Sequence, residues 1–147
     1  MNILVLGWFH HKNAGDDRIQ QAWTHFFDGH TLAFMPAGRN LPKALLLDYD
    51  LLVVGGGGLF TRNSGLPKRL LTYIKTGIPI WVAGVSAEAL EEEEVEQLKK
   101  FVDWGGVLQV RDEGSADLLG LPDKQVVPDL SFLIPFEPIQ NPKENAK

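Results

Sequence analysis

Asp50-Leu51-Leu52-Val53-Val54-Gly55-Gly56-Gly57-Gly58-Leu59-Phe60 is the stretch of sequence that decides the fold. No polar residue interrupts Leu51 to Val54, which is typical of a strand buried on both faces. The four glycines that follow predict a turn, because glycine tolerates positive φ and has no Cβ. Open α/β sheets bind ligands at the carboxyl ends of such strands, where bare backbone can lie against another molecule. The alternative role of the glycines is packing, in which they let a helix approach the sheet closely.

Similar apolar runs recur along the chain and alternate with segments of helical periodicity. We expect further strands at 3–6, 31–35, 78–84, 107–110 and 126–127, and helices at 16–27, 42–47, 66–76, 87–102 and 112–119. The first helix would bury one face made of Ile19, Trp23, Phe26 and Phe27. Strands that alternate with helices form right-handed βαβ units. The sequence therefore predicts a single doubly wound, mostly parallel, Rossmann-like sheet with helices on both faces over residues 1–135, and a polar tail or linker at 136–147.

Composition and charge limit the classes of function. The chain has 147 residues, a net charge of −5 and no cysteine. The absence of a Lys/Arg cluster disfavours nucleic acid and anionic membranes as partners, and the absence of cysteine excludes disulfides and thiolate chemistry. No stretch approaches the roughly 18 consecutive apolar residues of a membrane span, and the amino-terminal residues lack a signal-peptide pattern. We therefore expect a cytoplasmic protein without a transmembrane segment.

Polar residues at the first strand–helix junction form one half of the candidate ligand site. Asn13, Gly15 and Asp16 lie where open α/β sheets dock their ligands. Asn and Gly permit left-handed backbone, and Asp16 can cap the helix while presenting an oxygen, so pure capping is the alternative role. His10 and His11 are adjacent in sequence, and adjacent side chains point in different directions in most backbones. We therefore expect no metal site here.

Residues after the later strands form the other half of the candidate site. Gly56, Gly57 and Gly58 would supply the bare platform, and Ser86 follows the next strand at the same edge of the sheet. The alternative role of Ser86 is to cap the Glu-rich helix that we expect to begin at residue 87. Arg111, Asp112 and Ser115 follow the strand at 107–110. Arg111 is the natural cation for a carboxylate, phosphate or sugar hydroxyl, with a structural ion pair as its alternative.

Several common catalytic signatures are missing from the sequence. Neither G-x-G-x-x-G nor G-x-x-x-x-G-K-[ST] occurs. Asp16 and Asp17 also place negative charge at the start of the first helix, where a pyrophosphate would otherwise bind. An NAD-dependent dehydrogenase is therefore disfavoured. Hydrolase chemistry has no support either, because no Ser/His/Asp order or paired-carboxylate spacing stands out.

Taken together, the motifs over residues 3–134 resemble the polysaccharide pyruvyl transferase family in their order and spacing. The matching segments are Asn13-Ala14-Gly15-Asp16-Asp17 with Ile19, the stretch from Asp50 to Leu59, Pro79 to Ser86, Val110-Arg111-Asp112 with Ser115 and Leu118, and Pro128-Asp129-Leu130-Ser131-Phe132. The sequence departs from the family pattern at two places. Asp16-Asp17 stands where Asp-Glu is usual, and Gly84-Val85-Ser86 replaces a longer glycine-rich turn.

The resemblance implies transfer of the enolpyruvyl unit of phosphoenolpyruvate to sugar hydroxyls of a surface glycan or its lipid-linked precursor. It also implies a glycosyltransferase-B-like architecture of two Rossmann-like halves, in which the N-terminal half meets the acceptor and the C-terminal half holds the donor. The chain resembles the N-terminal half, and the Arg- and His-bearing donor motifs have no counterpart in it.

We therefore expect the acceptor-side half of such an enzyme, which would not be catalytic alone. Its ligand would be a sugar or glycan precursor, it would need no cofactor, and phosphoenolpyruvate would be the donor substrate. A separate C-terminal domain or a homo-oligomer would be its partner. The alternatives are a non-catalytic module that binds a sugar or nucleotide and a self-associating single-domain scaffold.

Overall fold

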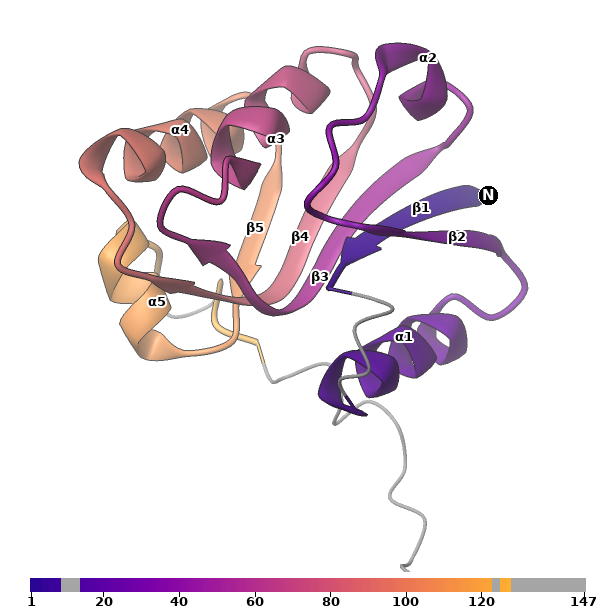
Figure 1. Cartoon of the computed structure of the whole chain (residues 1–147), viewed down its shortest axis with the longest axis horizontal. Helices are drawn as coiled ribbons and strands as arrows, with labels where there is room; N and C mark the ends of the chain where they lie inside the picture. The colour runs from indigo at the N-terminus through magenta and orange to yellow at the C-terminus, as the bar shows by residue number, and fades with distance from the viewer. Residues whose placement is uncertain (9–13, 123–124, 128–147) are drawn as a thin grey trace, which may run out of the picture.

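The computed structural model describes residues 1–8, 14–122 and 125–127, with side chains from residue 17 onward in the first helix. Strands and helices alternate along this part of the chain (Figure 1). In chain order they are β1 (Asn2–Gly7), α1 (Ala14–Phe26), β2 (Thr31–Pro36), α2 (Lys43–Leu46), β3 (Leu51–Thr61), α3 (Leu66–Ile74), β4 (Ile80–Glu88), α4 (Glu92–Asp103), β5 (Val107–Val110) and α5 (Glu113–Leu119). Within the described residues, no helix combines the length and apolar character needed to cross a membrane. The expected tail at 136–147 lies outside the described residues.

The five strands form one sheet in the order β2-β1-β3-β4-β5, and every pair of neighbours is parallel. The chain proceeds from β1 to β2 in one direction and from β3 to β5 in the other, so the strand order reverses between β1 and β3. This is the doubly wound order of flavodoxin-like folds. The predicted fold class is therefore confirmed. The short strand expected at 126–127 is reduced to one parallel bridge, between Val126 and Val110.

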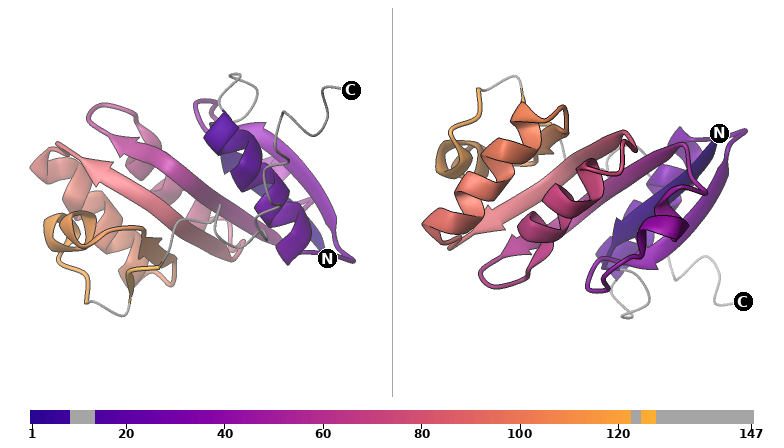
Figure 2. Two further views of the ribbon diagram at one scale, coloured as in Figure 1. Left: turned by 90° about the horizontal axis from the view of Figure 1, so that it is seen from below. Right: turned by 90° about the horizontal axis from the view of Figure 1, so that it is seen from above.

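The core is divided between the two faces of the sheet, and the two parts differ in size. The larger cluster joins β-strand residues such as Leu52 and Val82 to α2, α3, α4 and α5. The smaller one lies under α1 (Figure 2), where Ile19, Trp23 and Phe27 are buried as expected. The expectation for Phe26 was wrong, because this side chain is 52% exposed. Its ring packs edge-on against that of Trp23, with the ring centroids 5.9 Å apart.

The glycines do not end the buried strand, so the predicted turn is wrong. β3 continues through them to Thr61 and stays paired with β4, from Gly55 opposite Ala83 to Thr61 opposite Glu88. Gly56 and Gly57 have φ of 88° and 78°, and the register shifts between Gly57 and Phe60. Glycine conformations of this kind and a bulge bend a strand without breaking its pairing. Both strands accordingly curve in their last residues toward α5 (Figure 1).

The helix expected at 87–102 begins later, at Glu92, because β4 extends to Glu88. Its N-cap is Glu91, which forms a capping box with Glu94. The Oε1 atom of Glu94 accepts from the Glu91 backbone N–H at 3.2 Å. The capping role considered for Ser86 is therefore wrong, since Ser86 lies inside β4.

Candidate functional site

The candidate site lies at the point where the strand order reverses. β1 and β3 are neighbours there, and their carboxyl ends meet at one edge of the sheet. β1 ends at Gly7, and β3 reaches the same edge with its glycines. Doubly wound sheets bind ligands at this switch point. The sequence therefore placed the glycines at the edge where the topology favours a ligand.

Two of the four glycines are covered by α1, as the packing alternative predicted. A Cβ on Gly55 would lie 2.5 Å from Cζ2 of Trp23, and a Cβ on Gly56 would lie 2.5 Å from Cδ1 and Cγ2 of Ile19. Real Cβ atoms do not approach neighbours so closely, so the two glycines admit the helix against the strand. Gly56 was predicted to contact a ligand, but the Ile19 side chain covers it.

The other two glycines are less buried. Gly57 is half-buried and Gly58 is exposed. For Gly58, the Cβ position has only the Ser86 Oγ within 4 Å among the described residues, at 3.6 Å. A Cβ at Gly58 would therefore make only an ordinary contact with the described residues, and the Ser86 hydroxyl lies beside that position.

The Ser86 side chain is buried on the α1 side of the sheet. Its neighbours Val85 and Ala87 both belong to the larger core cluster, so strand alternation places Ser86 on the opposite face. Ser86 is 4% exposed, and its Oγ has no hydrogen-bond partner among the described residues.

The residues after β5 have structural partners. Asp112 is the N-cap of α5, and its Oδ1 accepts from the Ser115 N–H at 2.7 Å. The Ser115 hydroxyl accepts from the Ala87 N–H at 2.9 Å and donates to the Ala87 carbonyl at 3.4 Å, which ties α5 to the end of β4. Arg111 is half-buried, and its backbone N–H donates to the Val85 carbonyl at 2.9 Å. A ligand role for these three residues stays a prediction.

At the first junction, α1 starts earlier than expected, so that Gly15 and Asp16 belong to its first turn. Asn13, His10 and His11 lie outside the described residues. Among the residues that the structure does describe, no three His, Asp or Glu side chains are grouped as a metal site would require.

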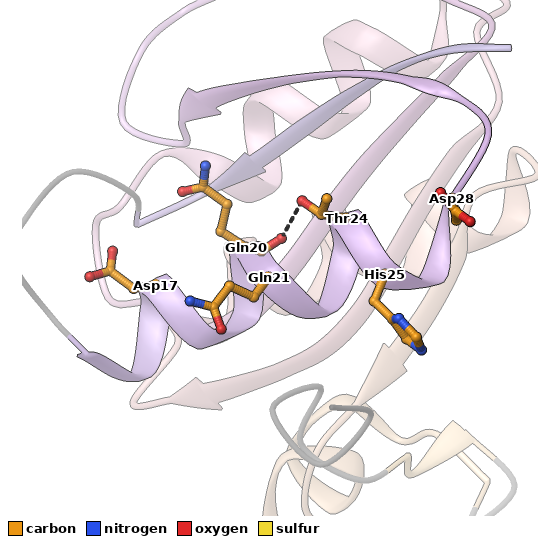
Figure 3. A pocket seen from close by; sticks show the side chains of 6 residues that line it. All are labelled: Asp17, Gln20, Gln21, Thr24, His25 and Asp28. Carbon is orange, nitrogen blue, oxygen red and sulfur yellow. Dashed lines mark hydrogen bonds between the residues drawn. The ribbon is translucent and has the colours of Figure 1, made fainter. Parts of the chain in front are cut away.

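A shallow hollow follows the outer surface of α1 (Figure 3). The Thr24 hydroxyl there donates to the Gln20 carbonyl of the same helix at 3.0 Å. The described lining residues come from α1 and from the turn directly after it, their side chains spread along the helix (Figure 3), and none was predicted as a site residue. They are Asp17, Gln20, Gln21, Thr24, His25 and Asp28.

Trp8 was missed as a candidate by the sequence reasoning. It directly follows β1 at the switch point, and 48% of its surface is exposed. An exposed aromatic side chain at a ligand edge offers a flat apolar surface for binding. The signal that could have identified it is its place in the sequence, immediately after the glycine that ends a buried strand.

The fold and this edge define a doubly wound α/β domain with an exposed glycine, Gly58, at its switch point. The chain belongs to the polysaccharide pyruvyl transferase family, whose model matches residues 5–146. Among solved structures, it is similar to the flavodoxin of Streptococcus pneumonia TIGR4, with 11% sequence identity, a TM-score of 0.40, and coverage of 90% of this chain and 92% of that one. A search of curated proteins gave no match.

Proposed function

We propose that this chain provides the acceptor side of a pyruvyl transfer, binding the sugar hydroxyls that receive the pyruvyl group from phosphoenolpyruvate. In that reaction two sugar hydroxyls add to C2 of the donor, its methylene carbon takes up a proton to become a methyl group, and inorganic phosphate leaves. The product is a ketal on a surface glycan or its precursor. Membership of the family supports the reaction class.

The observation that carries the proposal is the exposed Gly58 beside half-buried Gly57 at the switch point. A neutral sugar can approach bare backbone closely and needs hydrogen-bonding groups more than cations. Charge argues against the donor at this position, because Asp16 and Asp17 lie in the first turn of α1 and phosphoenolpyruvate is strongly anionic. The donor would be held by a separate C-terminal half, and the chain would not turn over alone.

Calorimetry with the purified chain tests the proposal. Methyl glycosides should give binding heat at millimolar concentration, whereas phosphoenolpyruvate should give none. Phosphate release should stay at background when the chain is mixed with both substrates. Turnover by the chain alone would contradict the division of roles, and the absence of heat with every sugar would remove the acceptor role.

A second candidate function, self-association as a scaffold, is favoured by a specific observation. Phe26, the last residue of α1, is 52% exposed, and Val107 on β5 is 46% exposed. Both lie next to the partly buried Trp81, which contacts the Phe26 ring and is the β-ladder partner of Val107. Exposed apolar surface of this kind favours pairing between identical faces. Sedimentation would show a dimer in the parent that Phe26→Ser and Val107→Ser abolish; a monomer at all concentrations would exclude this candidate.

A further inference from the structure

Ser86 carries a buried hydroxyl for which the fold has no evident use. Ser115 is buried to a similar degree, and its hydroxyl forms two hydrogen bonds with Ala87. The Ser86 Oγ forms none among the described residues. An unpaired buried hydroxyl destabilises a fold, so its presence calls for an explanation. A ligand that supplies the missing partner is one such explanation.

The position of Ser86 in the sheet points to where that ligand would lie. Gly57 pairs with Val85 and Phe60 pairs with Ala87, so Gly58 and Leu59 together oppose Ser86 alone. A bulge of this type often re-aims a side chain next to a functional site. Gly58 is exposed, and a Cβ built on it would lie 3.6 Å from the Ser86 Oγ.

We infer that the Ser86 hydroxyl hydrogen-bonds a hydroxyl of the sugar that lies over Gly58. The inference rests on the proposed function and names a contact within that same site. A serine hydroxyl both donates and accepts, which suits a sugar hydroxyl that does the same. The Oγ has no described hydrogen bond to give up, so a sugar hydroxyl would displace no partner in the described part of the chain. An anionic group is disfavoured by Asp17, which is exposed in the first turns of α1.

Two substitutions separate binding from folding. Ser86→Ala removes a hydroxyl that has no hydrogen-bond partner among the described residues, so the melting temperature should be unchanged or raised. Binding of the best methyl glycoside should weaken by roughly three- to tenfold. Gly58→Ala should fold normally, since its φ is not positive and its Cβ would make an ordinary contact at 3.6 Å. The new methyl group would occupy the ligand space and abolish binding. Thr72→Ala, which removes an exposed hydroxyl on α3, is the matched control and should change neither property.

The outcomes distinguish this inference from the proposed function. If a methyl glycoside binds the parent chain, and binds Ser86→Ala and Gly58→Ala equally well, the Ser86 contact is wrong while the acceptor role stands. If no glycoside binds the parent chain, both are wrong. A marked fall in the melting temperature of Ser86→Ala would show that the hydroxyl has a structural partner and would also overturn the inference. Inorganic phosphate that binds the parent, but not Ser86→Ala, would overturn the sugar assignment.

Discussion

Gly55→Ala tests whether the first glycines of β3 serve to seat α1. The added Cβ would lie 2.5 Å from Cζ2 and 2.7 Å from Nε1 of Trp23. Trp23 is fully buried, and its ring stacks on Phe27 with centroids 5.5 Å apart and meets Trp81 edge-on at 5.3 Å. The indole therefore has no free space into which it could move. Overpacking of this kind costs about 1–3 kcal/mol of unfolding free energy.

The matched control is Gly58→Ala on the same strand. Its Cβ would have one described neighbour, at 3.6 Å, so its effect should stay within about 0.5 kcal/mol. Both substitutions replace glycine by alanine, so both lower the conformational entropy of the unfolded chain by the same amount. The difference between them therefore isolates the contact with α1.

Urea denaturation followed by circular dichroism measures both variants, alone and combined with Trp23→Phe. Phenylalanine lacks the part of the indole that meets Gly55, so Gly55→Ala should be less destabilising in that background, with a coupling energy of about 1 kcal/mol. Equal costs of Gly55→Ala in the two backgrounds, or a cost no larger than that of Gly58→Ala, would refute the reasoning.

Two further predictions concern the ends of β3 and β4. Glu94→Ala should lower the unfolding free energy by about 1–2 kcal/mol in a urea titration. The Glu94 carboxylate accepts from the backbone N–H of the N-cap residue Glu91 and, at 3.4 Å, from the Asn63 N–H. The control is Glu96→Ala, which removes an exposed ion pair with Lys99 and should change the unfolding free energy by less than about 0.5 kcal/mol. Ser115→Ala should cost about 1–3 kcal/mol and speed amide exchange at Ala87, whose buried N–H loses its acceptor; unchanged exchange would contradict this.

Local sequence was enough to predict most of the fold. Leu51 to Val54 has no polar interruption, and a buried strand follows from that alone. The errors arose where long-range pairing overrides local preference. Glycines usually end strands, but β3 continues because β4 supplies partners as far as Glu88. The same extension moved the start of α4 to Glu92, which the acidic run alone could not show.

The candidate site was predicted only in part. The glycine edge could be located because a buried strand must present its carboxyl end at one side of the sheet. Which glycines stay open could not be predicted, since Ile19 and Trp23 reach them from a distant part of the sequence. The bulge that sets Gly58 and Leu59 opposite Ser86 depends on the register between two strands, which residue type does not encode.

The seating of α1 on β3 has a mechanical consequence. Trp23 and Ile19 of the helix pack where Cβ atoms of Gly55 and Gly56 would otherwise lie. The helix therefore cannot slide along the strand without forcing one of these side chains into the backbone. We therefore expect a change in the curvature of β3 to move α1 with it. The first turn of α1 would then move together with Gly57 and Gly58.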